Sequence, residues 1–494
     1  MSEPLPSSVE ELAALVEQLR VANAGLREVI AGQAMQLEAQ AQQLAAQAEQ
    51  IAQLTQRLGK DSATSSKPPS SDPPYRKPER RSSRRSSGRD PGTQRGAPGS
   101  AMPLVDDPNE TIICDPQRCT ECGADLAGAP VCGIARRQVT DVAPPPPPRV
   151  TEYRILTRAC PCCTARTPGP APAVATGRAQ YGPGLLGRAA ELLCAHYLPV
   201  GRAARLMASM LGVTPSTGFM ASVRGRAARL LERQFLPRVR ELLHAVGVLG
   251  ADETPVRAAG RLEYVHVAAT EFLTAMHTGG RSKDDIDNGQ ILPGYTGTIV
   301  RDGYAGYQHL IDAHHAWCGA HLIRDLAAFH RVDPEGQFWA AAMADTLTDA
   351  HHRAQAARAA GHDQLPPEVV TDIRRRYRGA TTAGISDNRS RAGPLAADAR
   401  TLARRFRTHE DMILRFVVDL AVPFTNNQSE RDVRPAKIQQ RTSGGCWRTL
   451  TGVADFAVVQ SYLSTATKWG LDSFDVLTQL FTTGAWLPPA ATPG

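Results

Sequence analysis

The chain has 494 residues, enough for about three domains of roughly 150 residues each with a sizeable core. It is basic, with a formal net charge of +7 and a pI near 8.9, which favours a polyanionic partner. No apolar stretch approaches the roughly 20 residues of a membrane span, and the N-terminus lacks a signal-peptide core. Ten cysteines are too few for a disulfide scaffold in a chain of this length. These features exclude the membrane-spanning and disulfide-rich secreted classes, and we expect a soluble, cytoplasmic protein with no membrane partner.

The first segment, residues 8–58, has the apolar repeat of a coiled coil. After an initial 3-4 spacing, apolar residues recur every seven positions at Ile30, Leu37, Leu44, Ile51 and Leu58. Glutamines at three further seam positions weaken the seam but can fix its register. We predict self-association into a homo-oligomer through this helix, and a solitary amphipathic helix is the alternative.

Residues 59–105 are predicted to be a basic, disordered linker. Ser, Pro, Gly and Arg dominate it, and residues 60–100 carry ten Lys or Arg against four Asp or Glu. Such a composition cannot bury a core. The segment is interpreted either as a nonspecific phosphate-binding tether or as a solvated linker, and the two interpretations are compatible.

Residues 106–170 are predicted to bind zinc. Two CxxC turns, Cys119–Cys122 and Cys160–Cys163, are separated by 37 residues, and each presents two thiolates about one tetrahedral edge apart. Together they would form a closed, structural Zn²⁺ site with no open position for chemistry. Cys114, Cys132 and Cys162 leave the ligand set open, and reduced, unmetallated thiols are the alternative.

Residues 184–240 have a helix-turn-helix pattern. Helices are expected over residues 185–197, 202–211 and 216–231, with a short Gly- and Pro-containing turn at 212–215 before the third. That helix carries Arg224, Arg226 and Arg229, the predicted DNA contacts. Any helical hairpin produces the same pattern, so a structural hairpin is the alternative.

From residue 246 the apolar period changes to that of strands. Strands are expected over residues 246–251, 262–270, 273–277, 297–301 and 315–318, followed by a helix over 321–329. Three strands in meander order, then strands alternating with helices, predict a mixed α/β sheet. Residues 335–415 are helical by pattern, as are 453–469 and 473–482, and the first of these stretches indicates an inserted all-α unit.

Three carboxylates are the candidate catalytic residues. Asp252 and Asp302 each end an apolar run, so we expect both at strand ends, where a rigid element opens toward substrate. Glu253 competes with Asp252, but in a strand its side chain points to the opposite face. Glu430 lies in a helix start, and three such groups can hold a pair of divalent cations for displacement at a phosphodiester. The alternative for either Asp is a solvated turn residue.

Glu430 has a rival role as a helix cap. Asn427 is a plausible N-cap with Glu430 three residues later, which is a variant of the capping box. Favouring the metal site is a cationic ridge along the same helix, a predicted DNA-phosphate contact. Its members are Arg431, Arg434, Lys437 and Arg441.

These motifs together resemble those of a known family. Residues 251–256, 301–307 and 426–435 resemble the first-aspartate, second-aspartate and glutamate motifs of the DDE transposases of the insertion-sequence-sixty-six family. Cys318 and His321 resemble the Cys-x-x-His that follows the second aspartate there, and residues 58–70 resemble the linker after that group's coiled coil. Residues 60–63 and 281–285 depart from the family pattern, but neither segment contains a member of the triad.

The resemblance implies a multidomain protein with an RNase-H-like α/β core over residues 245–330 and 420–450. A helical insertion over 331–419 would interrupt this core, in agreement with the 128-residue gap between Asp302 and Glu430, and C-terminal helices would occupy 451–494. It also implies two Mg²⁺ or Mn²⁺ ions, a zinc-binding region and a DNA-binding helix-turn-helix. We expect Asp252 to bridge both ions, and Asp302 and Glu430 each to complete one.

The partners implied are double-stranded DNA, as terminal inverted repeats and target, and accessory proteins encoded by the same element, in association with a bacterial nucleoid. Two other functions fit the same residues: a non-catalytic zinc and helix-turn-helix DNA-binding regulator, and an RNase-H-like nuclease without strand transfer. Cys318 and His321 could form a second metal pair, but two ligands alone hold no ion firmly. A supporting role beside the triad, or a place in the core, is the favoured interpretation of that pair.

Overall fold

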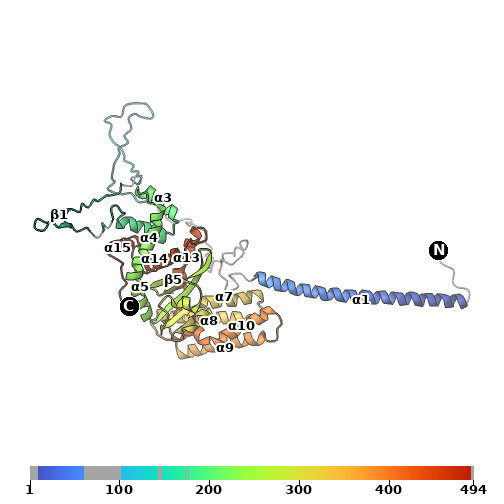
Figure 1. Cartoon of the computed structure of the whole chain (residues 1–494). Helices are drawn as coiled ribbons and strands as arrows, with labels where there is room; N and C mark the ends of the chain where they lie inside the picture. Colours follow the sequence, from blue (N-terminus) through green and yellow to red (C-terminus); the bar gives the residue numbers. More distant parts are fainter. Residues whose placement is uncertain (1–8, 60–101, 143–146, 173, 176, 491–494) are drawn as a thin grey trace. The chain divides into compact units, whose positions relative to one another are not determined.

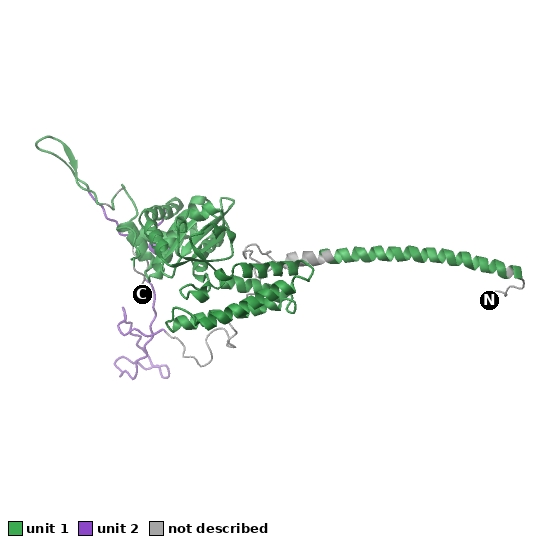
Figure 2. Cartoon of the chain, turned by 90° about the horizontal axis from the view of Figure 1, so that it is seen from below, with its two compact units in different colours: residues 1–78, 155–204, 216–494 green, residues 79–154, 205–215 purple. Residues whose placement is uncertain are grey.

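The computed structural model describes residues 9–59, 102–142, 147–172, 174–175 and 177–490. The chain divides into two compact units, one of residues 1–78, 155–204 and 216–494 and the other of residues 79–154 and 205–215 (Figure 2). Most of the predicted basic linker, residues 60–101, lies outside the described residues. No helix in the described part is long and apolar enough to cross a membrane.

The N-terminal segment is one helix, α1 (Val9–Gly59), of 51 residues and roughly 75 Å at 1.5 Å per residue (Figure 1). The predicted helix is therefore confirmed. The seam residues whose burial is described include seven that are exposed: Leu12, Leu15, Leu19, Leu26, Ile30, Leu37 and Leu44. A coiled coil with a second copy stays a prediction.

A five-stranded mixed sheet forms the centre of the larger unit. The strands β3 (Val248–Ala258), β4 (Arg261–Ala269) and β5 (Thr274–Gly279) are antiparallel neighbours. The strands β6 (Thr298–Arg301) and β7 (His314–Trp317) run parallel to β3, and the order across the sheet is β5-β4-β3-β6-β7. The mixed sheet predicted from the sequence is thus confirmed.

The strand β3 continues well beyond its expected end. We expected Asp252 at a strand end, and this was wrong because the antiparallel pairing with β4 extends to Ala258. The parallel pairing with β6 stops at Gly250. From that residue on, β3 has a strand on one side only, which also accommodates Pro255, a residue that cannot donate to a ladder. Asp252 therefore lies just beyond the paired part of the β3–β6 edge, inside the strand.

Two C-terminal helices cover one part of this sheet. The helix α13 (Asn427–Thr442) packs across β3 and β4, and α14 (Leu450–Lys468) packs along β5. The strand β5 is an edge of the sheet, and its backbone N–H groups at Thr274 and Met276 donate to hydroxyl groups on α14. Side chains of α14 thus satisfy an edge that would otherwise be open to pairing.

The long interval between β7 and α13 is helical, as predicted for residues 335–415. The helix α7 (Gly319–Val332) follows β7 directly, and α8 (Phe338–Ala359), α9 (Pro367–Asp387) and α10 (Pro394–Thr408) pack on one another beside it (Figure 1). Short helices α11 (Glu410–Ile413) and α12 (Arg415–Val418) lead back to the sheet. One buried cluster joins this unit to the sheet, with Trp339, Tyr377 and Phe406 from the helices and Val300 and Trp317 from β6 and β7.

The helices before the sheet form close to the predicted positions. They are α2 (Pro183–Cys194), α3 (Val200–Leu211), α4 (Thr217–Gln234) and α5 (Leu236–Ala245). Ser216 caps α4 by accepting a hydrogen bond from the Phe219 N–H at 3.1 Å. The helix α2 packs against α15 (Ser473–Thr482), and α4 packs against α14, so both are joined to the C-terminal helices.

Candidate active site and metal-binding residues

The three candidate carboxylates come from three elements: Asp252 from β3, Asp302 from the residue after β6, and Glu430 from the first turns of α13. Burial, and then the charges of Glu253, Asp302 and Glu430, raise the pKa of Asp252 to about 8. Because charge–charge interactions weaken with distance, this coupling means that the carboxyl groups lie near one another. Asp252 is thus within electrostatic reach of Asp302 and of Glu430, and a metal site made of the three stays a prediction.

The Asp302 loop is built on a buried arginine. Arg301 is only 1% exposed, and its guanidinium donates to the carbonyl oxygens of Asp302 and Tyr304, both at 2.9 Å. Its Nε donates to Nδ1 of His315 at 3.0 Å. Asp302 Oδ1 also accepts the Tyr304 N–H at 2.8 Å, which closes a turn around the carboxylate. The Arg301 guanidinium thus holds the Asp302 loop in place.

Glu430 does not act as a helix cap, so the alternative drawn from the capping box is wrong. The N-cap is Asn426 rather than Asn427, and no side chain caps the helix. The Asn426 side chain instead donates to the carbonyl oxygen of Ala251 at 2.7 Å. Glu430 Oε1 is buried and has no hydrogen-bond partner among the described residues. Its carboxylate is therefore free of the backbone, and its ion-pair partner is His321 Nδ1 at 3.6 Å.

Glu253 is engaged on the opposite face of β3. Its side chain is 3% exposed and pairs with the Arg281 guanidinium at 2.6 Å. The Tyr307 hydroxyl donates to its second oxygen at 2.8 Å. With both oxygens occupied, Glu253 contributes charge to the site and leaves Asp252 as the carboxylate that faces Asp302 and Glu430.

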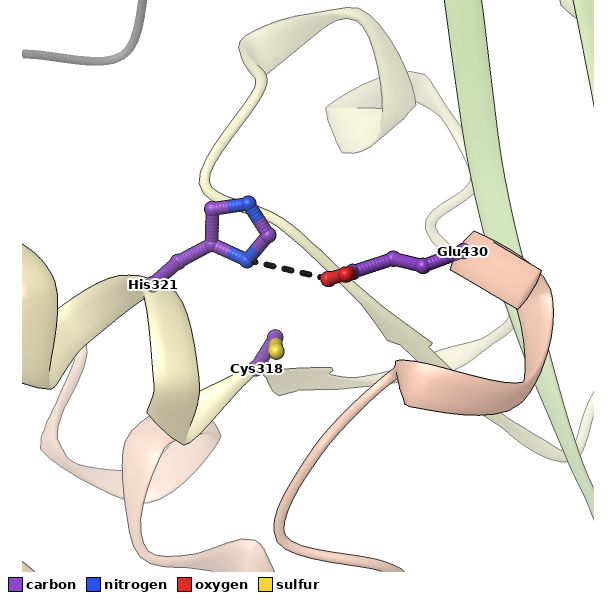
Figure 3. A group of neighbouring side chains, drawn as sticks. All are labelled: Cys318, His321 and Glu430. Carbon is purple, nitrogen blue, oxygen red and sulfur yellow. Dashed lines mark ion pairs between the residues drawn. The ribbon is translucent and has the colours of Figure 1, made fainter. Parts of the chain in front are cut away.

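Cys318 and His321 lie beside Glu430 (Figure 3). Cys318 ends the β7–α7 junction as the N-cap of α7, and its sulfur accepts the Asn426 N–H at 3.3 Å. His321 Nδ1 lies 3.6 Å from Glu430 Oε1. The Cys318 side chain, above all, and the charge of Glu430 raise the pKa of His321 to about 9 against the opposing effect of burial. These residues form the one group of three potential metal ligands within 4.8 Å of one another that occurs in the described part of the chain.

The cationic ridge of α13 is partly solvent-facing and partly bound to the sheet. Arg431, Arg434 and Arg441 are exposed. Lys437 is half-buried and donates to the carbonyl oxygen of Pro255 on β3, and burial lowers its pKa. Three of the four predicted phosphate contacts therefore face solvent, and the fourth ties the helix to the strand of Asp252.

The arginines of α4 divide in the same way. Arg226 and Arg229 are exposed. Arg224 is half-buried, and its guanidinium lies 5.6 Å from the centre of the Trp447 ring, where a cation is attracted by the aromatic face. Part of the predicted DNA-reading face is thus turned toward α13 and α14.

The two CxxC turns have matching backbone geometry. In each turn, the backbone N–H of the first Cys donates to the carbonyl oxygen of the residue five positions later. The carbonyl oxygen of the same Cys accepts a hydrogen bond from the N–H four positions later. The pairs are Cys119 with Ala124 and Gly123, and Cys160 with Ala165 and Thr164. In both turns backbone N–H groups lower the pKa of the first thiol, which favours the thiolate that zinc requires. The turns belong to different units, and a shared ion stays a prediction.

Comparison with known protein families agrees with these motifs. A family model described as "Transposase IS66 family" matches residues 178–454, more than half of the chain. A second model, described as a family of unknown function (DUF6444), matches residues 1–103. The search of curated proteins found no match.

Proposed function

Because the chain belongs to the IS66 family of transposases, we propose that it cleaves DNA at the ends of an insertion element and joins those ends to a target. Asp252, Asp302 and Glu430 are the proposed catalytic residues. The observation that carries the proposal is that burial, followed by the charges of Glu253, Asp302 and Glu430, raises the pKa of Asp252 to about 8. Perturbed carboxyl groups from separate elements are typical of an active site.

The donor set fits two Mg²⁺ or Mn²⁺ ions, because crowded carboxylate oxygens are the ligands that these cations prefer. When bound, such a pair activates the attacking hydroxyl and stabilises the leaving oxygen at the phosphodiester. Asp252 would contribute to both ions, with Asp302 and Glu430 each on one. The buried Arg301 supports this role by fixing the Asp302 loop. Glu253 would lie next to the site while bound to Arg281 and Tyr307.

The proposed core is RNase-H-like, with the helices between Asp302 and Glu430 as an insertion. A three-stranded antiparallel meander flanked by two parallel strands supports this assignment. Residues 184–240 are proposed to contact DNA through α4, and the exposed arginines of α13 to contact phosphates beside the carboxylates. These contacts predict binding that weakens steeply as salt is added.

The remaining regions have proposed architectural roles. The matched turns around Cys119 and Cys160 support a structural Zn²⁺ site completed by Cys122 and Cys163. The outward apolar seam of α1 supports self-association, since a long helix with exposed leucines gains stability by burying them against a second copy. Light scattering of the full chain, compared with a variant carrying Lys at Leu37 and Leu44, measures that association.

The central test uses labelled duplex DNA that carries the inverted repeats flanking the gene, incubated with the full chain and Mg²⁺. We expect cleavage and joining, both lost in Asp252→Asn and retained in Asp312→Asn, an exposed carboxylate outside the site. Cleavage without joining would assign the protein as a nuclease. Binding without cleavage would assign it as a DNA-binding regulator and would overturn the proposal.

A further inference from the structure

The Cys318, His321 and Glu430 side chains form a compact cluster that the proposed reaction does not need in full. One ligand atom from each lies within 4.8 Å of the others (Figure 3). His321 Nδ1 and Glu430 Oε1 are both buried and make no hydrogen bond in the described part of the chain, although they face each other at 3.6 Å. Their ion pair leaves both atoms without a hydrogen bond, and a cation bound by both would satisfy them.

The distances suit a small divalent cation. Ligand bonds to Zn²⁺ are about 2.0–2.3 Å, so its ligand atoms lie roughly 3–4 Å apart around a tetrahedron. The 3.6 Å between His321 Nδ1 and Glu430 Oε1 falls in that range, and all three ligand atoms of the cluster lie within 4.8 Å of one another. Sulfur, imidazole nitrogen and carboxylate oxygen form a borderline-soft donor set that selects Zn²⁺ over Mg²⁺. Cys318 is 1% exposed, so its sulfur is shielded from competing reactions with solvent. The sequence offered only two ligands here, and the fold adds the third.

We propose that Cys318, His321 and Glu430 bind one Zn²⁺-class ion, separate from the predicted four-cysteine zinc site. The ion takes the Cys318 thiolate, the imidazole nitrogen facing Glu430, and Glu430 Oε1. Three protein ligands leave one coordination position open. The second oxygen of Glu430 remains for an ion shared with Asp252 and Asp302. The bound ion would therefore link Glu430 on α13 to Cys318 and His321 at the N-terminus of α7.

The surroundings of the sulfur support this assignment. The backbone N–H of Asn426 donates to Cys318 Sγ at 3.3 Å, and such a donor stabilises a thiolate and orients it. The same N–H belongs to the N-cap of the Glu430 helix, which couples the geometry of two of the three ligands.

The test compares the metal content and Co²⁺ spectrum of the full chain with those of His321→Asn and Glu430→Gln, whose side chains are about one-third exposed and should not be needed for folding. Zinc is removed with a chelator, and Co²⁺ is added in known amounts. Cys446→Ala, which removes an exposed thiol elsewhere, is the matched control. We expect each variant to bind one ion fewer than the wild type and the control. Its affinity at this site should fall at least about tenfold, the lower limit for disturbing a metal's surroundings.

The thiolate itself is tested by Cys318→Ser, which should remove part of the sulfur-to-Co²⁺ charge-transfer absorption while the Cys446→Ala spectrum stays unchanged. Equal ion counts and equal spectra in the wild type, His321→Asn and Glu430→Gln would overturn the inference, whether or not Cys318→Ser folds. The proposed transposase activity is read separately, by DNA cleavage in Mg²⁺. If the wild type cleaves DNA but the variants bind as many ions as the wild type, only this inference is refuted. If the variants bind one ion fewer but the wild type never cleaves DNA, only the proposed function is refuted.

Discussion

Replacing Asp252 with Asn should stabilise the metal-free chain, and the gain should grow with pH. Burial and the neighbouring carboxylates raise the pKa of Asp252 from 3.8 to about 8 on folding. A carboxyl whose folded pKa is raised binds its proton more tightly in the folded chain. Its contribution to stability is therefore full below the unfolded pKa and is lost as pH rises through the folded pKa. Between pH 5 and 8 the wild type should lose about 1.4 kcal/mol of unfolding free energy per pH unit from this group, up to about 4 kcal/mol in total.

Denaturant unfolding in the presence of a chelator, followed by tryptophan fluorescence at several pH values, measures this difference. Asn cannot ionise, so the Asp252→Asn chain should lack that part of the slope, and the exposed Asp312→Asn should keep it. Added Mg²⁺ should stabilise the wild type far more than Asp252→Asn, because the cation replaces the proton at the carboxylate. A stability difference between variant and wild type that is the same at pH 5 and pH 8 would refute the electrostatic argument.

Three further predictions concern packing, a buried ion pair and DNA binding. Gly250→Ala should lower the free energy of unfolding by about 1–3 kcal/mol and reduce DNA cleavage, because the added Cβ would lie 2.3 Å from two side-chain oxygens at the α13 N-terminus. Gly247→Ala is the control, since nothing lies within 4 Å of its added Cβ, and it should be tolerated. Lys468→Met should lower the free energy of unfolding by about 3–5 kcal/mol, because it leaves the buried Asp432 without its ion-pair partner at 2.6 Å. Thermal melts should show that stability recovers when Asp432→Leu is added, and no recovery would contradict the pairing. Arg434→Ala should reduce the salt-dependence slope of DNA binding by about one, measured by fluorescence anisotropy across a salt series, and an unchanged slope would remove it from the phosphate contacts.

The strands and helices of the larger unit could be predicted because their signals are local. Alternating apolar residues set the strands, and the β3–β4 hairpin closes through Ala259 and Gly260, with φ of +50° and +75°. Two-residue loops of positive φ match the twist of paired strands. The helix of residues 473–482 begins and ends where the apolar pattern does, after the N-cap Asp472.

The length of β3 could not be predicted, because it depends on which neighbour continues to pair with it. The β4 partner extends to residue 261, whereas the β6 partner ends opposite Gly250. This mismatch turns the expected strand end at Asp252 into an open edge within a strand. The burial of Arg224 on α4 could not be predicted from the sequence either, because it contacts Trp447, a residue more than 200 positions away.

The geometry of the site depends on a residue that local rules assign to another role. An asparagine at a helix start is expected to cap that helix. Asn426 instead gives its side-chain amide to Ala251, next to Asp252, and its backbone N–H to Cys318. A buried carbonyl at the open edge of β3 is costly without a hydrogen-bond partner, and the Asn426 side chain supplies that partner instead of capping its own helix.

Glu430 owes its position to the hydrogen bonds of Asn426. With the Asn426 side chain committed to β3, the helix starts one residue earlier than a capping box would have it, and Glu430 is released from the backbone. Gly250 permits this approach, because any side chain there would collide with Asn426 and Ser429. Glu430 is thereby held near Asp252 by the Asn426 hydrogen bonds to Ala251 and Cys318, which join β3, α7 and α13. The order of the motifs in the sequence identifies the three carboxylates, but these contacts join the elements that carry Asp252 and Glu430.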